Sequence, residues 1–231
     1  MKTKLPKLPN FPNRESRFLS ASVELRAADD TESPNIVRGY AAKFNVESEN
    51  LGGEQWQFRE IITPGAFDDV LKDDVRALLN HESSAILARS KNGEGTLSLG
   101  ADEVGLWYEF EAPDTQIGRD LVTSLKRGDI DQSSFSFTVS KDGQDWEETQ
   151  VGDGPTLAVR TINKVKRLYD VSPVTYPAYP DATVALRSLE EFREEETPAP
   201  TPEEPTENHS IAHRQRALDL IDKTAKSTQP E

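Results

Sequence analysis

The chain has 231 residues, a formal net charge of −14 at neutral pH and no cysteine. This length is sufficient for one domain with its own hydrophobic core and additional tails. The excess of carboxylates argues against a nucleic-acid-binding protein, because phosphate backbones require clustered Lys and Arg. The lack of cysteine excludes thiol nucleophiles and Cys-based zinc sites.

The N-terminal segment combines basic residues with prolines at positions 6, 9 and 12. This composition predicts that residues 1–17 form a flexible, basic, Pro-rich arm. No apolar stretch follows the basic residues, and the sequence contains no run of about 18 apolar residues. We therefore expect neither a secretion signal nor a membrane-spanning helix, and no contact with a membrane.

Short apolar or alternating segments, separated by clusters of Gly, Asn and Asp, predict many β-strands after residue 18. The predicted strands are residues 20–26, 36–44, 55–62, 75–79, 96–99, 106–111, 133–139 and 157–171. A series of short strands of this kind is typical of a sandwich or a barrel. We therefore predict a mainly β fold with flanking helices (α+β).

Two segments have helical features. Residues 64–71 begin with a proline and predict a short helix, and residues 112–128 predict a longer one. In the longer segment Asp114 or Thr115 can cap the first turn, and Gly128 can take the left-handed conformation at the end. One face of this helix is apolar and consists of Ile117, Leu121, Val122 and Leu125.

The composition changes near residue 187, where acidic residues and prolines become frequent. Residues 188–208 are therefore predicted to be an acidic, Pro-rich, disordered linker, because such a segment cannot form a core. Residues 209–231 are expected to form a tail in which 210–226 can form an amphipathic helix, either a frayed helix without a role or a segment that docks to a partner. The folded domain is then expected to cover residues 18–187.

The chain has three histidines, of which only His81 lies in the predicted domain. Because there is no cysteine, nucleophilic hydrolysis would require a serine or threonine activated by this imidazole. Alternation in the strand 133–139 places Phe135 and Phe137 on one face, and Ser134 and Ser136 on the other. These residues alone do not distinguish a catalytic pair from a structural histidine and an inert serine face.

Several motifs occur in an order that resembles the prohead proteases of tailed phages. They are 39–45 (GYAAKFN), 58–67 (FREIITPGAF), 79–81 (LNH) with 87–89 (LAR), 134–137 (SFSF) and 169–180 (YDVSPVTYPAYP). The resemblance covers residues 20–187. It implies a capsid-maturation serine endopeptidase with a compact β-barrel similar to that of the herpesvirus assemblins, surrounded by helices.

Carried over by position, the resemblance implies that Ser134 is the nucleophile, His81 the general base and Asp170 the third member of the triad. The family usually has Glu at the third position, and commonly Gly where this chain has Ser136. Ser133 and Ser136 therefore remain alternative nucleophiles. The oxyanion donors stay open between backbone N–H groups near the nucleophile and the side chains of Arg89, Arg160 and Arg167.

The resemblance also implies the reaction and its setting. The enzyme would hydrolyse peptide bonds through an acyl-enzyme, without a metal or organic cofactor. Its substrates would be the scaffold segments of the major capsid protein and the protease itself, inside the assembling prohead in the host cytoplasm. A homodimer is a further expectation.

Two other function classes compete with this reading. One is a non-catalytic β-barrel that acts as a scaffold or capsid-assembly binding module. The other is a glycosidase with paired carboxylates, but solvated surfaces and the linker account better for the many acidic residues.

Overall fold

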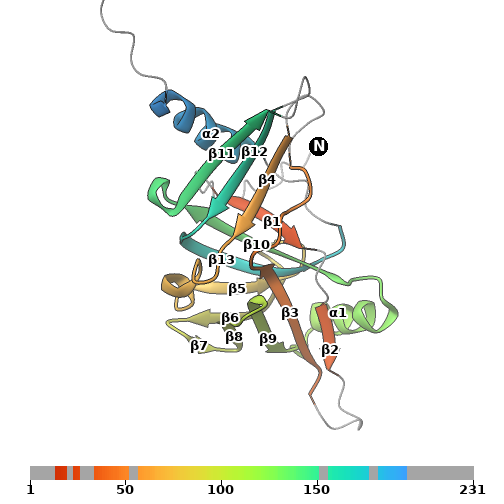
Figure 1. Ribbon diagram of the computed structural model, residues 1–231. Coiled ribbons are helices and arrows are strands. Elements are labelled where there is room, and N and C mark those ends of the chain that lie inside the picture. The colour runs from red at the N-terminus through yellow and green to blue at the C-terminus, as the bar shows by residue number, and fades with distance from the viewer. Residues whose placement is uncertain are drawn as a thin grey trace, which may run out of the picture. The chain divides into compact units, whose positions relative to one another are not determined.

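The structure is a computed structural model that describes residues 14–19, 23–26, 34–51, 57–150, 156–176 and 182–196. Within these ranges most of the regular structure is β-strand, and the helices are α1 and α2 with two short 3-10 turns (Figure 1). The mainly β class with flanking helices is therefore confirmed.

The largest sheet contains the predicted serine strand. Its strand order is β1-β10-β13-β5-β6-β7. These strands are β1 (Glu15–Leu19), β10 (Gln132–Val139), β13 (Val165–Val174), β5 (Val75–Leu78), β6 (Ile86–Lys91) and β7 (Glu94–Gly95). β10 pairs antiparallel with β1 on one side and with β13 on the other, and β13 pairs parallel with β5. The serine strand therefore lies between the first described strand and β13.

Two smaller sheets complete the β-structure of the described residues. One has the order β2-β3-β9-β8 and contains β2 (Val23–Arg26), β3 (Ile36–Lys43), β9 (Gly105–Glu111) and β8 (Leu97–Ala101). The other has the order β11-β12-β4 and contains β11 (Gln144–Gln150), β12 (Thr156–Ile162) and β4 (Gln57–Ile62). In the described ranges all three sheets are open, so they do not form a closed version of the compact β-barrel that the resemblance implies. Closure requires that edge strands pair, and the edge strand β7 is only two residues long.

Most predicted strands match observed ones, with two kinds of difference. The predicted strand 157–171 is divided into β12 and β13 at Asn163 and Lys164, whose N–H groups both donate to Gly143 O at 2.9 Å. In addition, β1, β6, β7 and β11 were not predicted. The missed β11 has only one buried residue, Trp146, so its sequence lacks the alternation of a half-buried strand.

The longer predicted helix is confirmed as α1 (Gln116–Arg127). The Thr115 side chain accepts a hydrogen bond from Gly118 N, and Gly128 ends the helix with a φ of 78°. The other predicted helix, at 64–71, is instead a turn followed by the 3-10 turn η1 (Asp68–Val70). Its Gly65 has a φ of 87°, which an α-helix does not permit.

Two of the predicted boundaries fall next to or inside elements that the structure describes. Residues 15–17, which we assigned to the flexible arm, belong to β1. At the other end α2 (Ala182–Glu196) crosses the boundary at residue 187, because its Ala, Leu and Glu residues favour a helix and Leu189 is buried. The predicted tail 209–231 lies outside the described residues. Among the helices that the structure describes, none is long and apolar enough to cross a membrane.

The core fixes the orientation of β10. Phe135 and Phe137 stack with ring centroids 4.8 Å apart, and Phe67 meets Phe135 edge-on at 5.7 Å. On β3, a Cβ atom at Gly39 would lie 2.8 Å from the hydroxyl of Tyr108, so this position requires glycine. The predicted alternation of β10 is confirmed, because both phenylalanines lie in the hydrophobic core.

Candidate active site

Ser134, His81 and Asp170, which are far apart in the sequence, meet on one face of the large sheet. His81 Nε2 lies 2.6 Å from Ser134 Oγ, and His81 Nδ1 lies 2.5 Å from Asp170 Oδ1. Ser134 comes from β10, Asp170 from the adjacent β13, and His81 from the turn that follows β5, the next strand along. The sheet order thus brings the three predicted site residues together.

The turn that carries His81 has an unusual backbone. Asn80 and His81 have φ angles of 55° and 58°, a left-handed conformation that costs about 1 kcal/mol per non-glycine residue. Asn80 holds this turn against the end of β13: its N–H donates to Pro173 O, and its Oδ1 accepts from Thr175 N at 2.8 Å. These bonds offset the backbone cost and direct the imidazole toward β10.

Asp170 is almost fully buried, with 1% exposure, and is surrounded by donors. Its Oδ1 accepts a hydrogen bond from Ser172 Oγ at 2.8 Å, and its Oδ2 accepts one from the guanidinium of Arg14. Burial raises the pKa of Asp170, but the hydrogen bond and charge of His81, the charge of Arg14 and the Ser172 bond outweigh it, so the pKa is lowered. An ionised carboxylate here accepts Nδ1–H and leaves Nε2 free to accept a proton.

The two alternative serines have different surroundings. Ser133 Oγ is hydrogen-bonded to the hydroxyl of Tyr108 at 2.7 Å, on the core side of β10. Ser136 Oγ lies 3.2 Å from His81 Nδ1, the nitrogen that faces Asp170, and 2.8 Å from Ser16 Oγ. Ser134 is the serine that contacts Nε2, so its geometry fits a nucleophile best.

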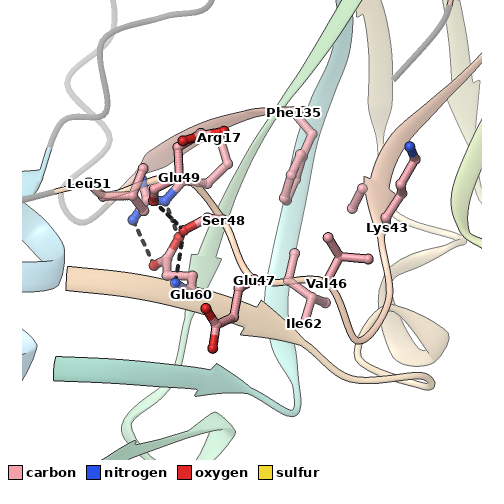
Figure 2. Close-up of a pocket in the computed structure, with 11 residues that line it drawn as sticks. Arg17, Lys43, Val46, Glu47, Ser48, Glu49, Leu51, Glu60, Ile62 and Phe135 are labelled. Carbon is pink, nitrogen blue, oxygen red and sulfur yellow. Dashed lines mark hydrogen bonds and ion pairs between the residues drawn. The ribbon is translucent and has the colours of Figure 1, made fainter. Parts of the chain in front are cut away.

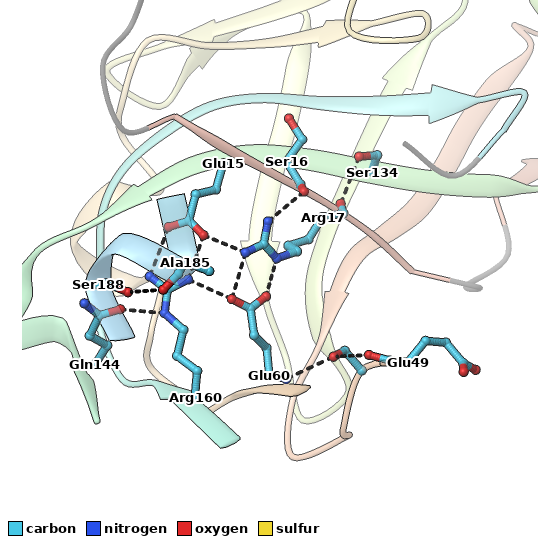
Figure 3. A network of polar contacts seen from close by, with 11 residues as sticks. Glu15, Ser16, Arg17, Glu49, Glu60, Ser134, Gln144, Arg160, Ala185 and Ser188 are labelled. Carbon is cyan, nitrogen blue, oxygen red and sulfur yellow. Dashed lines mark hydrogen bonds and ion pairs between the residues drawn. The ribbon is translucent and has the colours of Figure 1, made fainter. Parts of the chain in front are cut away.

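A buried cluster of four charged side chains lies beside β10, where β1 pairs with Phe135 and Phe137 (Figure 3). Arg17 donates to Glu15 Oε2 at 2.6 Å and to Glu60 Oε1 at 2.9 Å. Arg160 donates to the same two oxygens, at 2.6 Å and 2.7 Å. We call these four residues the buried ion cluster. No sequence motif indicates it, because its members come from β1, β4 and β12.

The arginines considered as oxyanion donors have other partners. Arg160 belongs to the buried ion cluster, and Arg89 forms two hydrogen bonds to Asp74, at 2.7 Å and 2.8 Å. The guanidinium of Arg167 lies over the Tyr169 ring, 4.8 Å from its centroid. The backbone N–H groups near Ser134 therefore remain the candidates for oxyanion stabilisation.

The two buried carboxylates Glu60 and Asp170 predict a loss of stability in acid. Burial raises the pKa of Glu60, but the charges and hydrogen bonds of Arg17 and Arg160 lower it by more than burial raises it. The net pKa shift is therefore downward, as it is for Asp170. The ordinary pKa values of these two groups are 4.5 and 3.8, so near and below these pH values the unfolded chain binds more protons than the folded one. The free energy of unfolding therefore falls as the pH drops through this range.

Urea denaturation at pH 7, 5, 4 and 3 measures this loss. Glu60→Gln removes one of the two titrating groups and should give a shallower decline between pH 5 and pH 3, although the variant is less stable at pH 7. An equal decline in wild type and variant would contradict the assignment of Glu60.

A pocket of about 190 Å³ adjoins the buried ion cluster (Figure 2). The residues that line it include Arg17, Glu60, Phe135, Lys43 and Glu47. Phe135 and Ser134 are neighbours on β10 and face opposite sides of it. The pocket therefore lies on the opposite face of β10 from the imidazole, next to the nucleophile strand.

Comparison with known proteins identifies what the chain is similar to. A family model described as the caudovirus prohead serine protease matches residues 21–195. Among solved structures, the capsid assembly protease gp21 of bacteriophage T4 is similar at 7% identity, with a TM-score of 0.31; the match covers 67% of this chain and 98% of that one. No curated protein matches the chain.

Proposed function

Because this chain belongs to the caudovirus prohead serine protease family, we propose that it is a capsid-maturation endopeptidase in which Ser134, His81 and Asp170 form the catalytic triad. The observation that supports this most is the pair of contacts made by one imidazole. Nε2 lies 2.6 Å from the Ser134 hydroxyl, and Nδ1 lies 2.5 Å from the Asp170 carboxylate.

In this proposal His81 acts first as a base and then as an acid. Nε2 accepts the hydroxyl proton while Ser134 Oγ attacks the carbonyl carbon, and the carbonyl oxygen becomes an oxyanion. The imidazolium then gives the proton to the leaving amine, and the peptide bond breaks to leave an acyl-enzyme. A water molecule activated by the same imidazole hydrolyses the ester and restores Ser134. Asp170 stabilises the imidazolium, and it holds the neutral imidazole in the tautomer that carries its proton on Nδ1.

The proposed substrates are the scaffold segment of the major capsid protein and the chain itself, inside the assembling prohead in the host cytoplasm. Self-association as a homodimer and an assemblin-like arrangement of the strands are parts of the same proposal. So is the division into an N-terminal arm, a protease domain, an acidic linker and a tail at 209–231 that docks to a partner.

Co-expression with the cognate capsid precursor tests the proposal. Wild type should remove the scaffold segment, and mass spectrometry of the new termini identifies the cut bonds. His81→Gln should leave the precursor intact, because loss of the base lowers such a reaction by about 10⁴-fold or more. An intact precursor with wild type, bound to the chain in pull-downs, would support the non-catalytic binding module instead.

A further inference from the structure

The strand β1 covers the outer edge of the nucleophile strand (Figure 1). β1 is the edge strand of the large sheet, and its register sets Phe18 opposite Ser134 and Arg17 opposite Phe135. β1 also precedes the region that the family model matches, which begins at residue 21. Without β1, β10 would present an unpaired edge beside Ser134. Such an edge is a template for an extended peptide.

The backbone of β1 accepts a hydrogen bond from the nucleophile that does not serve catalysis. Ser134 Oγ donates a hydrogen bond to the carbonyl oxygen of Arg17 at 2.9 Å. A hydroxyl has one proton, so donation to Arg17 O competes with donation to His81 Nε2, which attack requires. Ser134 is also 0% exposed, so another peptide cannot approach it while β1 is in place.

Arg14 and Ser16, just before and within β1, make further contacts around the triad. The guanidinium of Arg14 binds Asp170, whose other oxygen faces His81. The hydroxyl of Ser16 lies 2.8 Å from that of Ser136, beside the imidazole. One short segment therefore contacts the nucleophile, the carboxylate and their neighbour at the same time.

The buried ion cluster divides into two neutral halves. β1 contributes Glu15 and Arg17, whereas β4 and β12 contribute Glu60 and Arg160. If β1 leaves, Arg160 still donates to Glu60 at 2.7 Å. Departure of β1 thus removes one positive and one negative charge together, and Glu60 and Arg160 stay paired with each other. This division is consistent with an exchangeable strand.

We infer, on the basis of the proposed function, that β1 is a blocking strand in the substrate site. The substrate is then an extended peptide that replaces β1 along β10. It carries a carboxylate and a basic side chain two residues apart, which take the places of Glu15 and Arg17 against Glu60 and Arg160. The pocket beside Arg17 extends this site for the basic side chain.

The rate at which a fluorophosphonate labels Ser134 in the full chain tests the inference. The double variant Glu15→Ala/Arg17→Ala removes one neutral half of the cluster and should label at least about tenfold faster than wild type. The matched control is Arg38→Ala/Glu109→Ala, a pair at 3.3 Å between β3 and β9, which should label at the wild-type rate. Circular dichroism verifies that each variant is folded.

Three further measurements test the inference in addition to the labelling of the double variant. Arg14→Ala removes a side chain that is 27% exposed and should also accelerate labelling. A synthetic peptide with the sequence of residues 14–19 should slow the labelling of the double variant, and the same peptide with Ala in place of Glu15 and Arg17 should not. Substrate peptides with the Glu-x-Arg pattern should likewise be cut about tenfold faster than their Ala-substituted versions.

The outcomes separate this inference from the proposed function. Labelling of Ser134 at equal rates in wild type, the double variant and Arg14→Ala would overturn the blocking role of β1 and leave the proposed function intact. Failure of the peptide to compete would overturn the shared site. No labelling of Ser134 in any variant would overturn both.

Discussion

Replacing Ser134 with alanine is expected to lower kcat/KM for peptide hydrolysis by at least about 10⁴-fold, because no other group then forms the acyl-enzyme. The hydroxyl lies 2.6 Å from His81 Nε2 and comes from the centre of a strand paired on both sides. Its loss should therefore leave the fold in place, at a cost of about 1 kcal/mol for the missing hydrogen bonds. Cleavage of the capsid precursor, followed by mass spectrometry, measures the effect.

Ser136→Ala is the matched control for this variant. Ser136 lies on the same face of β10, two residues away, and its hydroxyl is also buried. It contacts His81 at Nδ1 rather than at Nε2, so its loss should change kcat/KM by less than about tenfold, the value of one hydrogen bond. The reverse pattern, with Ser136→Ala inactive and Ser134→Ala active, would transfer the role of nucleophile to Ser136.

Asp170→Asn is expected to lower kcat by about 10⁴-fold, the second large effect. An amide lacks the negative charge that stabilises the imidazolium, and its NH₂ group can face Nδ1 and impose the wrong tautomer. The lowered pKa of Asp170 means that the wild-type carboxylate is ionised at neutral pH. The substitution therefore removes a full charge from a buried site, and steady-state kinetics at pH 7 measure the result.

Two comparison variants make the Asp170 result specific. Asp129→Asn changes an exposed carboxylate that pairs with Arg127 at the surface, and should retain wild-type activity. Asp170→Glu keeps the charge and has the residue usual in the family, so it should lose less activity than Asp170→Asn, although the extra methylene must fit a buried site. An Asp170→Asn variant with nearly wild-type kcat would contradict the proposed role of the carboxylate.

The sequence was informative where a local pattern decides the structure. Thr115 and Gly128 mark the ends of α1 because capping and left-handed φ depend on residue type. The alternation of Phe135 and Phe137 with Ser134 and Ser136 predicted the two faces of β10 for the same reason. The resemblance of the motifs then selected His81, Ser134 and Asp170, and the structure brings these residues into contact.

Features that depend on distant partners were missed. Glu15 and Arg17 lie in a Pro-rich context that predicts a flexible arm, yet they pair with Glu60 and Arg160 from other strands. The order in which strands add to a sheet is not encoded in a local pattern, so neither β1 nor its position beside β10 was predicted. The compact β-barrel was implied by the family resemblance, whereas the number of strands fitted a sandwich or a barrel and does not determine how strand edges pair.

The identity of the residue modified by a fluorophosphonate is the decisive measurement for the whole account. The full chain is incubated to completion, digested, and sequenced by tandem mass spectrometry. A single adduct on Ser134 is expected, and it should be absent in His81→Gln. An adduct on Ser133 or Ser136, or no adduct on a folded chain that still cuts its precursor, would contradict this expectation.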